Sequence, residues 1–352
     1  MKRLLLILAI LATLPAIAQT EVNSFMSGTN EGITYCLPDT KIEITVNAVC
    51  ITRTPGEFSR YAERYLRIDN AITDAESFWE MTEATADAVG MPNAEKRYTI
   101  KLNNSTAANI VLDGNGIIES INGKNTIKAE KENTTAVTVK QRNDASRYMT
   151  GEMFQATSTA KLAELTAKEI YTVRESKLAI TRGLSENMPQ DGQSMKMVLD
   201  ELDKQEKALT ELFTGRSDTL YCSRTYTIVP EAGCDTTKAV LFRFSRKFGF
   251  LDKDDLAGEP VYYNMYDLRT VKLPTPDELA KKKVIKKEGV CYNVPGKAGL
   301  TLFTRSRKLF NGDIQAAQLG TTEVLSKDLF KKNSTTRIIF DTATGGIISI
   351  EK

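Results

Sequence analysis

Apolar and polar residues alternate along several segments of the chain, and this period of two predicts half-buried β-strands. The clearest case comes early, where Ile42, Ile44 and Val46 are separated by polar residues. A different period appears at positions 58–66, where apolar residues recur at i, i+3, i+4, i+7 and i+8 and predict a short helix. We expect four further short strands between positions 76 and 121, the last two joined by a Gly-Asn hairpin turn.

One phrase occurs twice: EGITYCLP at 31–38 returns as EGVCYNVP at 288–295. An apolar run, an Asp, a turn and a Gly-Ile-Ile sequence close the first stretch near position 118 and end the chain near position 348. Between the matches we expect the same series of strand, short helix and strands, with the second short helix at 311–319. Two similarities in the same order favour an internal duplication, and the alternative is that both are common strand and turn sequences. A duplication predicts that the two phrases lie in equivalent elements.

The middle of the chain has a helical pattern instead. Residues 152–184 spread Leu, Ile and Val among charges without a helix-breaking Pro, and residues 194–213 carry apolar side chains near heptad spacing. The turn sequence SENMPQDGQS separates the two segments. Two alternating runs follow, TLYCSRTYTIVP and KAVLFRFS, and they predict a strand hairpin.

Together these patterns predict an α+β fold. Two related, mainly antiparallel β modules with short helices are expected, separated by a long antiparallel helical hairpin. The expected divisions are a signal peptide at 1–18, a first α+β module at 31–123, a linker at 124–151, the helical hairpin at 152–214, a β-rich middle segment at 215–287 and the second module, a diverged repeat, at 288–352.

The first residues predict export. A basic pair at 2–3 precedes an apolar run, Pro15 ends that run, and the sequence Ala-Ile-Ala at 16–18 has the small-x-small form of a cleavage site. The alternative is a membrane anchor, but the apolar run is shorter than the ~20 residues that a spanning helix needs. No later segment is apolar enough to span a membrane, so no transmembrane segment is expected in the mature chain.

Composition excludes several classes of function. The chain has 47 Lys and Arg against 45 Asp and Glu, and loss of the basic pair at 2–3 leaves a net charge of zero. Without a basic excess we expect no nucleic-acid partner. The chain has no His, which excludes Ser-His-Asp and Cys-His catalysis and His-ligated zinc. Carboxylate pairs, Ser-Lys dyads and carboxylate-bound calcium stay open, no catalytic residue is assigned, and no cofactor is expected.

Five cysteines are present, and an odd number in an exported chain leaves at least one thiol free or intermolecular. Cys222 and Cys234 flank a predicted turn and are the candidate disulfide. The alternative is that the cysteines are small buried apolar residues of strands.

Aromatic residues supply the candidate ligand-binding positions. The strand sequence EPVYYNMYDL concentrates Tyr262, Tyr263 and Tyr266, and Trp79 is the single tryptophan. Exposed rings of this kind could stack on sugars, whereas buried rings would be strand core. The acidic sequence DKDD at 252–255 lacks the bidentate Glu of an EF-hand, and we predict no metal site there.

Several longer segments carry a resemblance. They are GITYCLPDTKIEITV, PGEFSRYAERYL, DGQSMKMVLDELDKQEKALTELFTG, VLFRFSRKFG, LAGEPVYYNM and FDTATGGIISI, and they extend over nearly all of the mature chain. The combined pattern resembles a family of secreted proteins of unknown function from Bacteroidetes-type bacteria, with a GxxYxLP motif and a central helical hairpin. The resemblance implies a place in the periplasm or outside the cell of a diderm bacterium, and it implies no activity and no catalytic residues.

The leading hypothesis is a non-catalytic envelope protein that binds another, unidentified envelope protein, with the helices of 152–214 as the binding arm. A glycan-binding module is the second hypothesis, and a carboxylate-based hydrolase is the third. The three differ in where the functional residues gather: on the helices, on the aromatic strand, or in a pocket with two acids.

Overall fold

The computed structural model describes residues 33–100, 110–123, 144–184, 191–233, 235–272, 289–326, 329 and 336–351. Strands account for 51% of these residues and form three antiparallel sheets. The predicted α+β class is therefore wrong, because the protein is mostly β. The predicted signal peptide at 1–18 and most of the predicted linker at 124–151 lie outside the described residues.

Each sheet combines segments that are distant in sequence. The stalk sheet has the order β2-β1-β5, the body sheet β10-β9-β8-β6-β7 and the base sheet β12-β11-β4-β3. The strands are β1 (Ile33–Thr54), β2 (Glu76–Ile100), β3 (Ile110–Leu112), β4 (Ile118–Ile121), β5 (Arg216–Ile228), β6 (Thr236–Ser245), β7 (Gly249–Leu251), β8 (Glu259–Asp267), β9 (Gly289–Phe303), β10 (Lys308–Ser326), β11 (Arg337–Phe340) and β12 (Ile347–Glu351).

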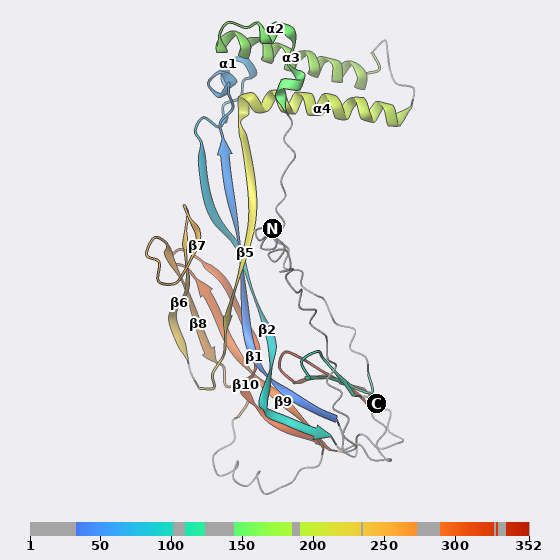
Figure 1. Cartoon of the computed structure of the whole chain (residues 1–352), viewed down its shortest axis with the longest axis vertical. Helices are drawn as coiled ribbons and strands as arrows, with labels where there is room; N and C mark the ends of the chain where they lie inside the picture. The colour runs from blue at the N-terminus through green and yellow to red at the C-terminus, as the bar shows by residue number, and fades with distance from the viewer. Residues whose placement is uncertain are drawn as a thin grey trace, which may run out of the picture.

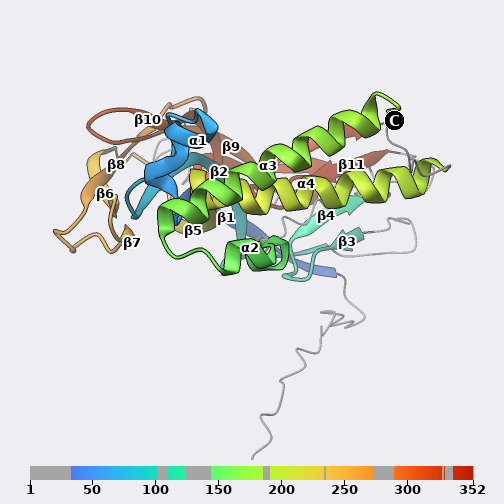
Figure 2. The same ribbon diagram turned by 90° about the horizontal axis from the view of Figure 1, so that it is seen from above.

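The helices gather at one end of the molecule and do not separate two modules (Figure 1). They are α1 (Ala62–Leu66), α2 (Gly151–Phe154), α3 (Thr159–Thr181) and α4 (Gly192–Thr214), with the 3₁₀ turns η1 (Ser59–Tyr61) and η2 (Ala145–Tyr148). Seen from above, α3 and α4 lie side by side across the end of the long sheet (Figure 2). We call these six elements the head.

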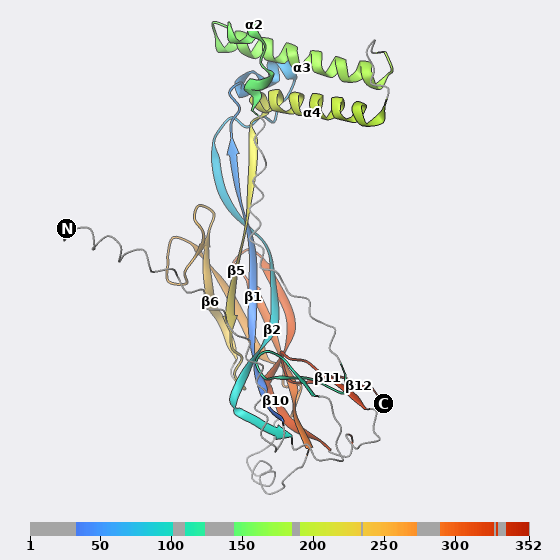
Figure 3. The ribbon, with the colours of Figure 1, turned by 45° about the vertical axis from the view of Figure 1, so that its right-hand side comes forward.

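The stalk sheet connects the head to the rest of the protein. β1 has 22 residues and pairs with the 25 residues of β2, and at about 3.3 Å per residue β1 is about 70 Å long. Its first half lies against the body sheet, and its second half continues with only β2 and β5 beside it up to the helices (Figure 3). The four short strands expected between 76 and 121 are in fact one long strand and two short ones.

The main core lies between the stalk and body sheets. Ile42, Ile44 and Val46 are each 0% exposed, so the predicted alternation in this strand is confirmed. They pack in one cluster with apolar side chains of the body sheet, among them Phe242, Val261, Leu300 and Leu302. Burial on one face and polar residues on the other is what a period of two produces in a strand.

Several local predictions fail because they depended on long-range pairing. Residues 311–319 form part of β10 rather than a helix. β5 and β6 were predicted to form a hairpin, but β5 pairs with β1 whereas β6 pairs with β7 and β8. The predicted modules are not separate bodies either, since β4 of the first stretch pairs with β11 of the last.

The two copies of the repeated phrase nevertheless begin equivalent strands. Each copy opens a long strand, β1 or β9, that pairs antiparallel with the next long strand, β2 or β10. Both pairs are interrupted close to the Pro of the phrase by a bulge, in which four residues of the second strand, 93–96 or 317–320, lie opposite a single residue of the first strand. The backbone N–H of Cys36 donates to the carbonyl of Gly116 (2.9 Å), and the corresponding N–H of Asn293 donates to Gly345 (3.0 Å).

The short hairpins that follow share their turn geometry. In each hairpin an aspartate, Asp113 or Asp341, accepts through Oδ1 from the backbone N–H two residues later. Each turn then contains a glycine with a positive φ, +78° at Gly116 and +70° at Gly345, a conformation that favours residues without a Cβ. The second turn is one residue longer.

A cluster of buried and half-buried polar side chains links these elements. We call it the polar node; its members are Thr40, Asn293, Gln318, Thr322 and Thr344. The amide Nδ2 of Asn293 donates to the carbonyls of Thr344 (2.8 Å) and Pro38 (3.1 Å), and its Oδ1 accepts from Thr322. Thr40 is held by Gln318, which accepts from its N–H and donates to its carbonyl. Because these groups have partners, their burial avoids the cost of unsatisfied polar atoms.

Candidate functional site

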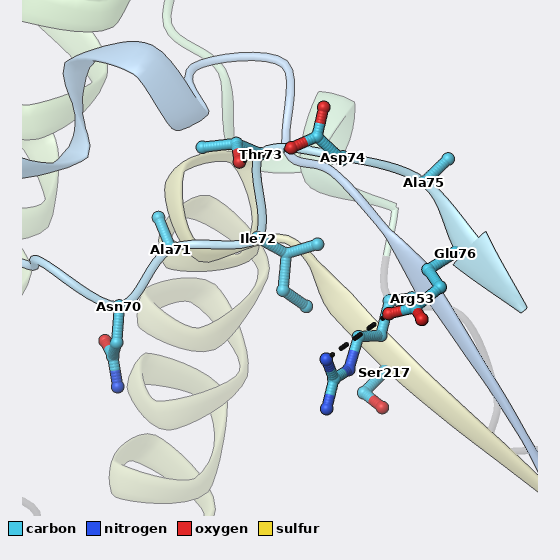
Figure 4. A pocket seen from close by; sticks show the side chains of 9 residues that line it. All are labelled: Arg53, Asn70, Ala71, Ile72, Thr73, Asp74, Ala75, Glu76 and Ser217. Carbon is cyan, nitrogen blue, oxygen red and sulfur yellow. Dashed lines mark hydrogen bonds and ion pairs between the residues drawn. The ribbon is translucent and has the colours of Figure 1, made fainter. Parts of the chain in front are cut away.

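An open pocket of about 710 Å³ lies at the neck, where the connection between α1 and β2 crosses the ends of β1 and β5 (Figure 4). Its lining is polar and charged over much of its surface: Arg53, Asn70, Ala71, Ile72, Thr73, Asp74, Ala75, Glu76 and Ser217. The backbone N–H of Ile72 donates to the carbonyl of Thr214 at 2.9 Å, and this bond fixes the connection to the end of α4.

Two acids line this pocket, which is what a carboxylate-based hydrolase requires. The carboxylate of Glu76 is engaged by Arg53 at 3.6 Å and by Arg246 at 3.3 Å, and Asp74 accepts a hydrogen bond from Thr73 at 2.9 Å. Both acids are exposed, whereas a catalytic acid pair works through burial or close like charge that separates the two pKa values. The arrangement favours a structural role in holding the neck together.

The four predicted aromatic residues do not gather in one place. Val261 and Met265 of β8 face the core, so Tyr262 and Tyr266 lie on the opposite, outer face of the body sheet. Tyr262 stacks on Phe303 with ring centroids 5.7 Å apart, and Tyr266 is 38% exposed. Tyr263 packs instead against the core cluster.

Trp79 lies on β2 of the stalk sheet, whereas the three tyrosines lie on β8 of the body sheet. It packs against the main core, and a Cβ built on Gly249 of β7 would touch the indole at 3.0 Å. The backbone N–H of Trp79 donates to Arg246 at 2.7 Å. The indole therefore covers the start of β7, and only Tyr262 and Tyr266 share a surface.

The described cysteines are Cys36, Cys50, Cys222 and Cys291, and Cys36 is buried while the others are partly buried. Cys234 lies outside the described residues, so the predicted Cys222–Cys234 disulfide stays a prediction. Burial raises the pKa of the Cys291 thiol and outweighs the hydrogen bond from Tyr35, which acts the other way. A raised thiol pKa keeps Cys291 protonated at neutral pH and argues against a nucleophilic role.

The hydroxyl of Tyr35 donates to the carbonyl of Cys291 at 2.9 Å, which links the two repeated phrases directly. Burial raises the pKa of the Tyr35 phenol far above its ordinary range, so the phenol stays protonated and remains a donor. This contact is a structural link between β1 and β9.

The buried core of the head lies at the end of the helix pair that is next to the strands. Phe58, Ile170, Leu209 and Phe213 are each 0% exposed, and the Phe58 and Phe213 rings lie 5.3 Å apart. The predicted helix near 58–66 is confirmed as η1 and α1, which deliver Phe58 to this cluster. The cluster anchors the stalk to the helices.

Local sequence explains where the two long helices begin. The Ser158 hydroxyl accepts from the N–H of Lys161 at 3.2 Å, and the Asp191 carboxylate accepts from the N–H of Ser194 at 2.8 Å. Both are N-caps that satisfy otherwise unpaired donors of the first turn. Gly215, with φ +75°, ends α4 and turns the chain into β5.

The opposite end of the helix pair has no comparable core. We call residues 174–184 and 191–204 the distal end, and none of these residues is buried. Four large apolar side chains are exposed there: Leu178 at 49%, Leu184 at 72%, Met197 at 67% and Val198 at 38%. Such a concentration of exposed apolar side chains on a helical surface is typical of an interaction site.

Ion pairs hold the two helices together where the distal end begins. Arg174 contacts Glu206 at 2.6 Å, and Lys177 contacts both Glu206 (2.8 Å) and Asp203. Partial burial opposes ionisation of Glu206, but the hydrogen bonds from Lys177 and Arg174 outweigh it and lower the pKa of its carboxyl. The hydrogen bonds to Asp203 and Glu206 raise the pKa of Lys177.

The helical pattern alone did not identify these exposed residues. The apolar positions of the two segments, which include Leu178 and Val198, are compatible with packing between the helices or with a groove for a partner, and their spacing does not separate the two. The lengths of the elements give a hint of the exposure. Each long helix has 23 residues, whereas η1 and α1 have 3 and 5 and are too short to cover more than one end of the pair. Within the described part of the chain, no group of Cys, Asp and Glu is placed to hold a metal ion.

Comparison with known protein families assigns nearly the whole chain to one family. Residues 31–348 match the family described as "Domain of unknown function (DUF4831)". No curated protein and no solved structure matches. Among the described residues, no helix is both long enough and apolar enough to cross a membrane.

Proposed function

We propose that this chain, which belongs to the DUF4831 family, is a non-catalytic exported protein that binds a protein partner through the distal end of its helix pair. The observation that carries the proposal is the exposure of Leu178, Met197 and Val198 on the two helices and of Leu184 just after α3, whereas the other end of the helix pair packs in a buried cluster. The partner offers a complementary apolar groove or face.

The contrast within one helix pair supports this assignment. A helix that is held only for structural reasons buries its apolar stripe along its whole length. Here α4 buries Leu209 and Phe213 near the strands but exposes Met197 and Val198 at the other end. Met adapts to irregular partner surfaces, which makes it common at protein–protein contacts.

The rest of the architecture suits a presenting role. The stalk sheet holds the helices beyond the sandwich, and the distal end overhangs the stalk to one side (Figures 1 and 3). The ion pairs of Glu206 with Arg174 and Lys177 keep the two helices in register where the overhang starts. A surface that is preorganised in this way loses less conformational entropy when a partner binds.

Export and origin belong to the same proposal. The segment at 1–18 has the order of a signal peptide, a basic start, an apolar run and a small-x-small site. We place the mature chain in the periplasm or outside the cell of a diderm, Bacteroidetes-type bacterium, where it meets an envelope protein.

We also infer an ancestral duplication of the strand and hairpin segments. Its support is the equivalence of the bonds from Cys36 to Gly116 and from Asn293 to Gly345, together with the matching turns of Asp113 and Asp341. The segments are interleaved in shared sheets, so the duplication does not divide the protein into two bodies.

Partner capture from envelope extract tests the binding proposal. The bait is the mature chain, compared with a distal-end variant that carries Leu178→Ser, Met197→Ser and Val198→Ser. A matched control carries Phe248→Ser and Leu256→Ser, which removes exposed apolar surface (56% and 83% exposed) far from the helices. We expect one protein to be retained by the wild type and the control and lost by the distal-end variant. Equal retention by all three baits would contradict the proposal.

A glycan-binding role is the second candidate, because Tyr262 and Tyr266 lie on one outer face and Tyr262 stacks on Phe303. Sugar rings stack on such aromatic faces in the same way. Glycan-array binding that disappears with Tyr262→Ala and Tyr266→Ala, but persists with Trp79→Phe, would support this role. Silence of the wild-type chain across bacterial and host glycans would rule it out.

A further inference from the structure

The base sheet repeats one pairing register across all four of its strands. Ile110 of β3 lies opposite Ile121 of β4, Ile121 lies opposite Ile338 of β11, and Ile338 lies opposite Ile350 of β12. A second row runs in parallel through Val111, Ser120, Ile339 and Ser349. The sheet is therefore a continuous ladder in which each hairpin adds two strands with the same residues in register.

The β3–β4 hairpin and the β11–β12 hairpin are related by a translation across the sheet rather than by a two-fold axis. β3 corresponds to β11 and β4 corresponds to β12, because the turns of Asp113 and Asp341 share their hydrogen bonds. If a two-fold axis related the hairpins, equivalent strands would meet at the junction. Instead β4 meets β11, which is the counterpart of β3. A step of this kind does not close on itself, and among the described strands β3 and β12 are the two edges at which it could be repeated.

β12 is an edge strand of the base sheet, and its apolar residues are exposed at positions where the equivalent residues of β4 are buried. Ile121 on β4 lies between β3 and β11 and is 0% exposed, whereas its counterpart Ile350 on β12 has only β11 beside it among the described strands and is 49% exposed. Glu119 is 8% exposed, and its counterpart Ile348 is 54% exposed. Edge strands are normally protected by charges or prolines. Here the described edge offers two isoleucines before Glu351.

We propose that the base sheet is a self-association surface, and that β3 of a second copy of this chain pairs antiparallel with β12 of the first. The pairing repeats the β4–β11 junction, with Ile350 opposite Ile110 of the second copy and Ser349 opposite its Val111. The contact is heterologous, so each copy uses a different edge and copies join head to tail.

A second copy fits this edge better than an unrelated peptide for a specific reason. The protein already contains the complementary edge, since β3 carries Ile110 and Val111 where β11 carries Ile338 and Ile339. The junction inside the chain consists of only two register pairs, so the contact between copies is small and weak. It forms where the protein is concentrated, and it leaves the helix pair at the other end of the molecule free.

Cysteine cross-linking between two single variants tests the register. The matched mixtures are Ile110→Cys with Ile350→Cys, and Val111→Cys with Ser349→Cys. The mismatched mixture is Ile110→Cys with Ser349→Cys, whose side chains point to opposite faces of the sheet. Because opposite residues come within disulfide distance, we expect a mixed disulfide in at least one matched mixture and none in the mismatched mixture. The unsubstituted chain gives the background of its own cysteines.

Sedimentation of the full mature chain supplies an independent measurement. We expect self-association at high concentration, and an apparent Kd about tenfold higher with Ile350→Lys, which places a charge in the edge. Circular dichroism confirms that each variant is folded. Three results would overturn the proposal: a chain that stays monomeric at its highest soluble concentration, equal cross-linking in matched and mismatched mixtures, or cross-linking of Ile350→Cys only to itself. The first two of these results would not count against the proposed binding role of the helices.

Discussion

The polar node and the distal end of the helix pair differ in the kind of side chain that they bury. At the polar node, Asn293 and Thr40 are 2% and 0% exposed, and their polar atoms are hydrogen-bonded. At the distal end of the helix pair, Leu184 and Met197 are 72% and 67% exposed. The polar node buries polar side chains, and the distal end exposes apolar ones.

The difference separates stability from function. Buried polar groups that are fully hydrogen-bonded fix one arrangement of the strands that meet there, at the risk of a large loss if one partner is removed. Exposed apolar side chains contribute little to the fold, and several of them at one place on the surface are typical of a contact with another molecule. Substitutions at the two places should therefore have effects of different kinds.

The largest loss of stability is expected where the helices meet the strands. Phe213→Ala empties the site of a fully buried ring that packs on Phe58, and such truncations cost about 3–5 kcal/mol. Thermal unfolding followed by circular dichroism measures the loss. Phe154→Ala is the matched control, because Phe154 is 67% exposed and its truncation should cost less than about 0.5 kcal/mol. Similar losses in both variants would mean that this cluster does not anchor the head.

A smaller but clear loss is expected at the polar node. Asn293→Leu keeps the bulk of the side chain and leaves the carbonyls of Pro38 and Thr344 without this donor, at a cost of about 2–3 kcal/mol. Denaturant unfolding gives the free energy. Asn311→Ala, at an exposed position of β10, is the control and should change stability by less than about 0.5 kcal/mol. A neutral Asn293→Leu variant would show that apolar packing replaces the node.

The smallest effect is expected from the ion pairs that join the helices. The lowered pKa of Glu206 means that its contribution is present above the ordinary value of 4.5 and is lost as pH falls through the lowered value. The raised pKa of Lys177 means that its contribution is present below 10.5 and is lost as pH rises through the raised value. Between these limits the pairs contribute below about 1 kcal/mol, because they are partly exposed.

Glu206→Gln should therefore lower the free energy of unfolding slightly at neutral pH, and the variant should lose less of this free energy than the wild type when the pH is lowered. Unfolding curves of wild type and variant at neutral pH and below pH 4.5 measure the difference. Lys161→Gln is a control, because Lys161 pairs with Glu164 on the same helix and does not join α3 to α4. An acid limb that is identical in wild type and Glu206→Gln would contradict a role for these pairs.

The sequence predicts elements whose pattern is local. The alternation of Ile42, Ile44 and Val46 identified a half-buried strand, and the apolar spacing at 58–66 identified a short helix. The segments 152–184 and 194–213 were predicted as helical, and α3 and α4 lie within or close to them. Each of these predictions depends on neighbours within a few residues.

Arrangement was harder to predict, because it depends on partners far along the chain. The Asn-Gly-Asp sequence at 311–313 suggests a helix cap, but β9 offers a long edge and draws these residues into β10. Tyr263 and Tyr262 are adjacent, and only the sheet decides which faces the core. The exposure of Leu178 is equally invisible in sequence, since it depends on which parts of the helices α1 and η1 cover.

The most direct measurement of the central claim is hydrogen exchange on the mature chain with and without the captured partner. We predict that protection gained on binding concentrates in the described peptides of 174–184 and 191–204, while the peptides of β8 and of the base sheet exchange as before. Protection on β8 around Tyr262 and Tyr266, with none at the distal end of the helix pair, would contradict the account.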